Sequence, residues 1–311
     1  MELRNIGRSG LRVSLIGLGC NNFGGRTGIN ESKPVIHAAL DAGITLFDTA
    51  DIYGGQGGSE IALGQWLGPR RKDIILASKF GMAMDERGEK KGGSRRYIMQ
   101  AVEETLRRLK TDWIDLYQLH RPDPLTPIEE TLRALDDLIR AGKVRYIGCS
   151  NLPAWQVVDA QACAQMQGLH HFICAQDEYS LLFRKAEDEL IPALRAKGMG
   201  LLPFYPLAGG MLSGKYHRHT PAPQGSRFAD PKLASRYLHD DNWPKVEKLE
   251  AFCAERGKSL LELAFSWLAA QDVVPSIIAG ATKPEQIAQN IAAANWKLTA
   301  AELAEIDQIT R

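Results

Sequence analysis

The chain has 311 residues, of which 44% are hydrophobic, and its 38 Lys and Arg against 37 Asp and Glu leave a formal net charge of +1. Mixed charges in this balance exclude a strong electrostatic attraction to nucleic acid or to an anionic membrane. No apolar stretch approaches the roughly 18 residues of a membrane span. A small molecule is therefore the expected binding partner.

Eight short apolar runs divide the chain, and a hairpin pattern over residues 3–13 precedes the first of them. Most runs are continuously apolar rather than alternating, which is typical of strands buried on both faces of a parallel sheet. The runs cover residues 15–18, 45–47, 74–77, 114–119, 144–147, 172–175, 200–204 and 274–278.

Helical patterns lie between the apolar runs. One helix is expected over residues 30–40, and another begins at Ser94. A third is predicted to begin with a capping box, in which Thr126 caps the helix and Glu129 is its partner. This helix ends at Gly142, a residue suited to the left-handed position after a helix.

The strand starts recur at about 30-residue spacing, and eight strand and helix units in about 250 residues predict a (β/α)8 TIM barrel. We expect one domain over residues 1–311, with an N-terminal β-hairpin and a long functional loop over residues 206–243, after the seventh strand. A doubly wound open sheet is the alternative. It is disfavoured because the pair Gly17 and Gly19 does not continue into a dinucleotide-binding glycine motif.

Polar residues follow the apolar runs, and in a barrel the carboxyl ends of the strands meet at one mouth. Asp48, Tyr53, Lys79 and His120 lie at such ends. An ammonium close to a phenol stabilises the phenolate and lowers its pKa, so Lys79 is expected to activate Tyr53 as an acid. Asp48 would keep Lys79 charged, and His120 would hydrogen-bond a carbonyl oxygen or help to shuttle its proton.

Four motifs stand at the expected strand ends: Phe47-Asp-Thr-Ala-Asp-Ile-Tyr-Gly54, Ser78-Lys-Phe80, Asp115-Leu-Tyr-Gln-Leu-His-Arg-Pro-Asp123 and Gly148-Cys-Ser-Asn151. Together they resemble the aldo-keto reductase family, and the resemblance spans the chain. It implies a (β/α)8 barrel, NAD(P)H-dependent reduction of an aldehyde, ketone or sugar carbonyl, and a catalytic tetrad that carries over to Asp48, Tyr53, Lys79 and His120.

The same resemblance implies a nicotinamide site. Ser150, Asn151 and Gln176 would hydrogen-bond the carboxamide, and Tyr205 would stack on the ring. The loop that follows is similar to the family's pyrophosphate loop, in which glycine permits close backbone approach. Its candidate contacts are Leu207, Gly209 and Gly210.

The eighth strand and helix unit resembles the family's adenosine-phosphate clamp. Many members carry Lys and Arg where this chain has Gly280 and Gln286, but other branches of the family have Gln at the second place. Lys283 is the candidate for a 2′-phosphate, so NADPH is favoured over NADH. The alternative for Lys283 is a solvated residue at a helix start. The candidate clamp residues are Gly280, Thr282, Lys283, Gln286, Gln289 and Asn290.

Substrate contacts are the least determined part of the sequence. Three arginines admit an anionic substrate such as a phosphorylated or sulfonated sugar, because guanidinium binds such groups bidentately. For each arginine taken alone, a surface role is the favoured interpretation. The candidates are Asn21, Phe23, Arg26, Arg121 and Arg227, with Trp113 as a further lining residue. The substrate's identity and the oligomeric state stay open.

Two other functions compete with the reductase. One is a Schiff-base aldolase, in which Lys79 attacks a carbonyl as a neutral amine. The other is suggested by the resemblance, because some family relatives are cofactor-binding channel subunits that sense redox state. The lack of a long N-terminal extension disfavours this second alternative.

Cysteine, histidine and leader patterns add expectations about location and metals. No charged-then-apolar leader begins the chain, so we expect a cytoplasmic protein. Five cysteines without a C-x-x-C pair favour neither a disulfide framework nor a zinc site. The pairs His170-His171 and His217/His219 lack companion ligands at metal-binding spacing, so no metal is predicted.

Overall fold

The computed structural model describes residues 1–223 and 225–311. Eight parallel strands form one sheet in the order β10-β3-β4-β5-β6-β7-β8-β9. From β3 to β9 each strand pairs with the next one in sequence, and the last strand, β10, pairs with β3. The strands are β3 (Ile16–Gly19), β4 (Leu46–Asp48), β5 (Ile75–Phe80), β6 (Ile114–Leu119), β7 (Val144–Ser150), β8 (Phe172–Glu178), β9 (Gly200–Phe204) and β10 (Ile277–Gly280).

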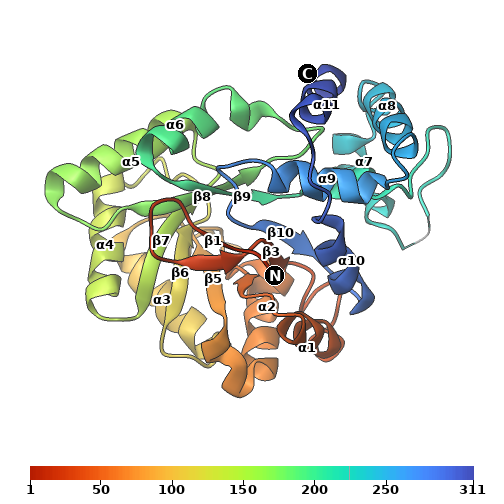
Figure 1. Cartoon of the computed structure of the whole chain (residues 1–311). Coiled ribbons are helices and arrows are strands. Elements are labelled where there is room, and N and C mark those ends of the chain that lie inside the picture. The colour runs from red at the N-terminus through yellow and green to blue at the C-terminus, as the bar shows by residue number, and fades with distance from the viewer. Residues whose placement is uncertain (224) are drawn as a thin grey trace.

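The sheet curls into a nearly closed barrel because β9 and β10, the ends of the strand order, also lie beside each other. The backbone N–H of Leu201 donates to the carbonyl of Val273 at this seam, at 2.8 Å. Helices surround the strands (Figure 1). The predicted (β/α)8 barrel is therefore confirmed, and the eighth strand begins at Ile277 rather than at residue 274.

An antiparallel hairpin of β1 (Leu3–Asn5) and β2 (Arg12–Ser14) lies across the end of the barrel where the strands begin (Figure 1). Its turn contains Gly7 at φ +54°, and a Cβ there would lie 2.4 Å from the carbonyl oxygen of Gly198. Only glycine lets the two backbones approach this closely. The predicted hairpin is confirmed, and it is fixed to the loop before β9.

The helices that connect the strands bury one face against the barrel, as α4 does with Leu132, Leu135 and Leu138. The connecting α-helices are α1 (Lys33–Asp41), α2 (Tyr53–Trp66), α3 (Arg95–Leu109), α4 (Ile128–Arg140), α5 (Ala154–Gln167), α6 (Leu190–Lys197), α7 (Pro231–Tyr237), α8 (Asn242–Ala254), α9 (Leu260–Ala269), α10 (Glu285–Ala293) and α11 (Ala300–Thr310). Short 3-10 helices are η1 (Gly68–Asp73), η2 (Lys185–Glu187), η3 (Ala208–Ser213) and η4 (Arg227–Ala229).

The helix starts test the capping predictions directly. Ser94 caps α3 as predicted, because its hydroxyl accepts the backbone N–H of Tyr97. The capping box at Thr126 was wrong. The helix begins one residue later than predicted, with Pro127 at the N-cap position, and the Thr126 hydroxyl donates to the Asp123 carboxylate at 2.7 Å. Proline has no side-chain oxygen that could accept a backbone N–H, so this helix start has no side-chain cap.

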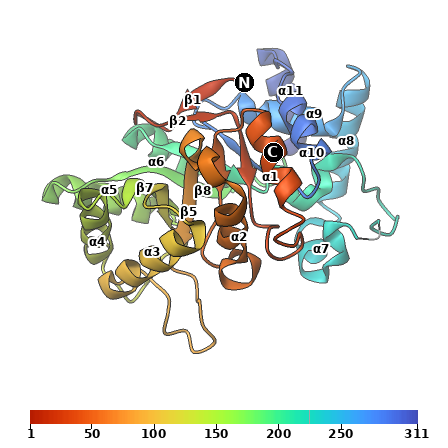
Figure 2. The same cartoon turned by 90° about the horizontal axis from the view of Figure 1, so that it is seen from below.

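The segment over residues 206–243 is not a plain loop. It contains η3, η4 and α7, and this segment lies with α8 on the side of the barrel next to α9 and α10 (Figure 2). Phe228 and Tyr237 are buried within it. Residue Gln224, which falls in this predicted functional loop, lies outside the described residues.

Several further features concern the whole described chain. All five cysteines are buried and free. No described helix combines the length and apolar character needed to cross a membrane. Among the described residues, no group of three or more His, Cys, Asp or Glu side chains is arranged to hold a metal ion.

Candidate active site

A cavity of about 750 Å³ opens at the carboxyl ends of the strands. It is the place where parallel strands aim the residues that follow them, so side chains distant in sequence meet there. Three of the four predicted tetrad residues, Asp48, Tyr53 and His120, line it. The fourth, Lys79, is fully buried beneath it.

Asp48, the last residue of β4, joins three neighbouring side chains. Its Oδ2 accepts a hydrogen bond from Lys79 Nζ at 2.7 Å. Its Oδ1 accepts hydrogen bonds from Gln176 Nε2 at 2.8 Å and from Gln118 Nε2 at 3.4 Å. A buried carboxylate needs partners of this kind to offset the loss of hydration. Gln118 was not singled out in the sequence, because an amide inside an apolar run carries no local signal.

The ammonium of Lys79 has three acceptors for its three protons. Besides Asp48, they are the carbonyl of Thr49 at 2.9 Å and the hydroxyl of Tyr53 at 3.5 Å. Burial by itself lowers the pKa of Lys79. The Asp48 carboxylate and the Tyr53 oxygen together raise it by more than burial lowers it, so the pKa of Lys79 lies above its ordinary value. A charged amine without a lone pair cannot attack a carbonyl, which disfavours the Schiff-base alternative.

Tyr53 meets this pair from the start of α2. Burial raises the pKa of its phenol, and this effect exceeds the lowering caused by the Lys79 ammonium. The expected direction, a lowered pKa, is therefore wrong for the phenol as it lies in this structure. The ammonium still acts in the expected sense, because it favours the phenolate over the phenol wherever the proton leaves.

His120 follows β6 and faces Tyr53, with the two ring centroids 5.7 Å apart and nearly perpendicular. Burial lowers the pKa of the imidazole to about 3, and the Lys79 and Arg121 charges lower it as well. His120 is therefore neutral near pH 7. Its Nδ1 is buried without a hydrogen-bond partner in the described structure.

The residues expected around a nicotinamide lie at the carboxyl ends of β7, β8 and β9 or directly after them. Ser150, Asn151, Gln176 and Tyr205 all line the cavity. Asn151 has φ +60°, and its amide donates to the His120 carbonyl at 3.1 Å and to the Ser150 hydroxyl at 2.9 Å. These bonds hold the two polar side chains beside His120.

The pyrophosphate-loop and clamp candidates line the same cavity, with one exception. Lys283 is exposed and does not line it. Gln286, in the first turn of α10, holds the segment before this helix in place. Its Oε1 accepts hydrogen bonds from the backbone N–H groups of Thr282 at 2.7 Å and Lys283 at 3.2 Å. The lining members are Leu207, Gly209, Gly210, Gly280, Thr282, Gln286, Gln289 and Asn290.

Tyr205 connects the mouth to the segment over residues 206–243. It has φ +51°, and its ring packs edge-on against Tyr237 at 6.1 Å between centroids. The Tyr237 hydroxyl donates to Glu178 Oε1 at 2.5 Å, and Arg236 forms an ion pair with Glu178 Oε2. Burial raises the pKa of Glu178, against the lowering effects of Tyr237 and Arg236.

The cavity also carries cations that the sequence did not single out. Lys215 and Arg236 line it together with Arg227, which lies over the Tyr205 ring at 5.5 Å. Arg236 is paired with Glu178, whereas Lys215 and Arg227 form no ion pair with another described residue. The positions of Lys215 and Arg236 became evident only from the loop's conformation, since each stands in a segment without a strand, whereas Arg227 was already a candidate substrate contact.

The expected substrate contacts divide into two groups. Asn21, Arg26, Arg121 and Arg227 line the cavity. Phe23 does not: it is fully buried, because its apolar ring packs into the core.

The prediction that Trp113 lines the substrate pocket is also wrong. This tryptophan precedes β6, so it lies at the opposite end of the barrel, where its ring packs under the guanidinium of Arg71 at 4.5 Å. A residue at the start of a barrel strand cannot reach a site at the strand's end.

Comparison with known proteins agrees with this geometry. The profile of the Aldo/keto reductase family matches residues 15–311. A protein of Oryza sativa subsp. japonica named "Probable voltage-gated potassium channel subunit beta" is 39% identical over 301 residues, covering 94% of this chain and 91% of the relative. An Arabidopsis thaliana protein of the same name is 37% identical over 319 residues, covering 99% and 96%.

A bacterial relative carries a different name. The "Uncharacterized oxidoreductase YrpG" of Bacillus subtilis (strain 168) is 37% identical over 308 residues, covering 96% of this chain and 92% of the relative. The family and this relative support oxidoreductase chemistry on small carbonyl compounds. The chain belongs to the Aldo/keto reductase family.

Proposed function

We propose that this protein is an NADPH-preferring reductase of aldehyde, ketone or sugar carbonyls, with Tyr53 as the general acid. The observation that carries the proposal is the chain of contacts from Asp48 through Lys79 to Tyr53, which ends beside a neutral His120 at the cavity mouth. This arrangement presents a phenolic proton and an imidazole to one point. Those are the groups that a carbonyl oxygen requires as it gains negative charge.

The cavity suits a phosphorylated dinucleotide. Its volume lies within the roughly 300–1,000 Å³ of small-molecule sites, and its wall includes the cations Lys215 and Arg227, which form no ion pair with another described residue. Ser150, Asn151 and Gln176 supply amide and hydroxyl groups at one end, as a carboxamide requires. NADPH would supply the hydride for the reduction. Lys215 and Arg227 would hold phosphate, which places the charge for a 2′-phosphate in the 206–243 segment as well as at Lys283.

The protein's own residues then perform the proton transfer. The Tyr53 hydroxyl donates its proton to the carbonyl oxygen, and the Lys79 ammonium stabilises the phenolate that remains. Asp48 holds Lys79 in its charged form. A neutral His120 donates a hydrogen bond to the same oxygen and so orients the carbonyl.

Two arginines of the cavity wall favour a particular class of substrate, the anionic carbonyl compounds. Arg26 and Arg121 line the cavity, are exposed, and have no carboxylate partner in the described chain. Two arginines at a mouth favour anionic substrates over neutral ones. We expect phosphorylated or sulfonated aldehydes to be reduced with a higher kcat/KM than their uncharged analogues, and the Arg26→Ala/Arg121→Ala variant to lose this difference.

The first experiment combines nucleotide binding with turnover. NADPH and NADH are titrated by tryptophan fluorescence, and carbonyl reduction is then measured for the wild type, Tyr53→Phe and the control Tyr146→Phe. Tyr146 offers the same chemical change at the other end of the barrel. Tyr53→Phe should bind NADPH normally and lose turnover by at least about 100-fold. Full turnover in Tyr53→Phe would end the proposed acid role, and failure to bind either nucleotide would end the reductase proposal.

A second candidate follows from two relatives that are named as probable potassium channel beta subunits. In that case the same cavity would bind the nucleotide to report redox state within a larger complex, with little turnover. Tight NADPH binding together with negligible reduction of a broad carbonyl panel would favour this function. Substantial turnover that depends on Tyr53 would favour the reductase.

A further inference from the structure

A second cavity, of about 650 Å³, lies at the opposite end of the barrel from the candidate active site. It is formed where β7 and β8 begin, and the turn of the β1–β2 hairpin and the end of α6 complete its wall. Ile147 lines this cavity, and Ser150, three residues later on β7, lines the other. The two cavities share no residue.

Basic side chains dominate the polar part of this wall. Arg8, Arg145, His170, His171 and Lys197 line the cavity, and no described Asp or Glu does. In a chain whose net charge is only +1, this is a local concentration of positive charge. Such a concave basic surface attracts anions.

Most of these basic groups lack an ion-pair partner among the described residues. This holds for Arg8, Arg145, His171 and Lys197. His170 is the exception, because its Nδ1 lies 2.6 Å from Asp136 Oδ1, behind the cavity wall.

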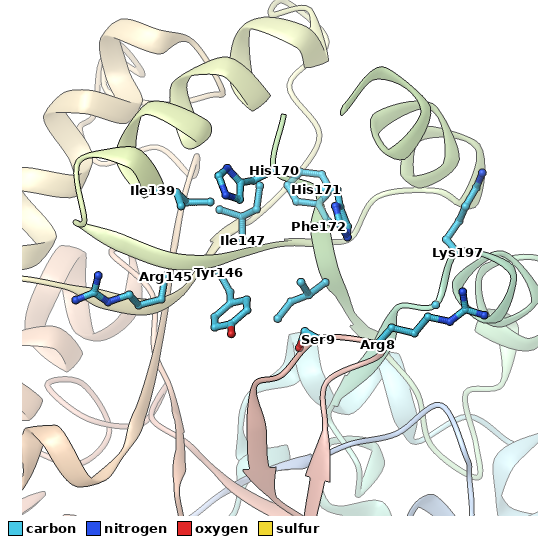
Figure 3. A pocket seen from close by; sticks show the side chains of 12 residues that line it. Arg8, Ser9, Ile139, Arg145, Tyr146, Ile147, His170, His171, Phe172 and Lys197 are labelled. Carbon is cyan, nitrogen blue, oxygen red and sulfur yellow. The ribbon is translucent and has the colours of Figure 1, made fainter. Parts of the chain in front are cut away.

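The cations surround an apolar floor. Figure 3 shows Arg145 on one side and Arg8 with Lys197 on the other, with His170 and His171 in between. The accessible apolar part of the floor is formed by the partly exposed Ile139 and Tyr146, because Ile147 and Phe172 are buried within the wall. A ligand that fits both features carries negative charge at its edge and a flat or apolar body.

Arg8 is held in place by the local backbone. Its N–H donates to the carbonyl of Gly198 at 2.8 Å, and its side chain crosses the face of Gly198. A Cβ on Gly198 would lie 2.6 Å from Arg8 Cδ and 2.8 Å from its Nε. Because Gly198 has no side chain, the aliphatic part of Arg8 can pack directly against its backbone. An arginine side chain that is already positioned in this way loses less conformational entropy when a ligand binds.

We propose that this cavity binds a small organic anion, a phosphate, sulfonate or carboxylate on an apolar or aromatic body. The guanidinium of Arg8 and the ammonium of Lys197 contact the anionic group, Arg145 on the other side adds to the positive potential, and the partly exposed Tyr146 ring packs against the body. The volume matches a small molecule rather than a macromolecular surface. This proposal is independent of the reductase function.

The test is isothermal titration calorimetry with 1-naphthyl phosphate, and with 1-naphthol as the uncharged probe of the same body. Two cavity variants are compared with the wild type: Arg8→Gln/Lys197→Gln and Arg145→Gln. Lys72→Gln/Arg96→Gln removes the same charge from two exposed residues outside both cavities. Lys215→Gln/Arg227→Gln removes it from the candidate active site.

The proposal expects 1-naphthyl phosphate to bind the wild type and the cavity double variant to weaken that binding at least tenfold. The single variant should weaken it to a lesser degree, and both control doubles should bind as the wild type does. It is overturned by wild-type protein that does not bind the phosphate, or by 1-naphthol that binds equally well. Equal weakening in Lys72→Gln/Arg96→Gln, or weakening confined to Lys215→Gln/Arg227→Gln, also overturns it. Matching thermal midpoints show that the exposed substitutions leave the fold intact.

Discussion

The Nζ of Lys79 lies 2.7 Å from Oδ2 of Asp48, and the Lys79 side chain has no exposed surface. An ion pair at this depth is costly to break, because removing one partner leaves the other charge buried and unpaired. The pair also bears on the proposed proton donor, since the same ammonium contacts the Tyr53 hydroxyl. Stability and catalysis are therefore expected to respond together to changes at Asp48.

Replacing Asp48 with Asn should lower both quantities. We expect turnover to fall by at least about 100-fold, and the free energy of unfolding to fall by about 3–5 kcal/mol, because the Lys79 charge loses its partner. Urea unfolding and steady-state kinetics measure the two effects. The double variant Asp48→Asn/Lys79→Met should regain much of the stability without regaining activity. Wild-type turnover in Asp48→Asn would contradict the role given to the pair.

The neutral state of His120 predicts the shape of the pH–rate profile. Because burial lowers the pKa of the imidazole to about 3, no inflection is expected near pH 6.5, the ordinary value for histidine. The raised pKa of Tyr53 keeps the phenol protonated up to at least its ordinary value near 10. Turnover should therefore stay level between about pH 5.5 and 8.5. An inflection near pH 6.5 that disappears in His120→Gln would refute this assignment.

The same lowered pKa makes His120 a source of acid sensitivity. The unfolded chain takes up a proton near pH 6.5, whereas the folded chain does so only near pH 3. Stability from this residue is thus present above pH 6.5 and is lost as pH falls toward 3, by up to about 1.4 kcal/mol per pH unit. His120→Gln should show a smaller difference in unfolding free energy between pH 7 and pH 4 than the wild type.

Asp51 predicts the opposite slope. Burial and then the charge of Glu60 raise the pKa of its carboxyl to about 8, and its Oδ1 has no described partner. The folded state keeps this proton up to about pH 8, whereas the unfolded chain releases it near 3.9. Its contribution to stability is full below pH 3.9 and is lost as pH rises to about 8.

Asp51→Asn should remove that loss and should be more stable than the wild type at pH 8. Chemical unfolding between pH 5 and pH 8 measures the slope for both proteins. Asp73→Asn is the matched control, because Asp73 is exposed. The unfolding free energy of this variant should depend on pH as that of the wild type does. A wild-type slope that survives unchanged in Asp51→Asn would show that another group causes it.

Glu178 anchors the 206–243 segment to the barrel through Tyr237 and Arg236. Hydrogen bonds to a charged group contribute about 1.5–3 kcal/mol, so Glu178→Gln should loosen the segment by roughly tenfold or more. The expected result is faster limited proteolysis within residues 206–243 and faster NADPH dissociation. Asp272→Asn, which alters an exposed ion pair with Arg195, should change neither. Equal proteolysis of both variants and the wild type would exclude the anchoring role.

Most of the barrel, and the meeting of Asp48, Lys79 and His120 in the candidate active site, were predictable from local pattern. Buried parallel strands produce continuous apolar runs, and residues directly after such runs must lie at the mouth once the strands are parallel. Asp48, Lys79 and His120 follow from this rule because each stands within a residue or so of a strand end. The Ser94 cap follows from equally local chemistry.

Tertiary structure decided what depends on packing between distant segments. Thr126 donates to Asp123 rather than capping its helix, and Phe23 turns into the core rather than toward a substrate. The direction of the Tyr53 pKa shift required the balance between its burial and the Lys79 charge. Lys215 joins the candidate active site through the conformation of a long connection. Local sequence determines where strands begin and end, but long-range contacts determine loop paths, burial and the fields that shift a pKa, because these depend on neighbours far away in the chain.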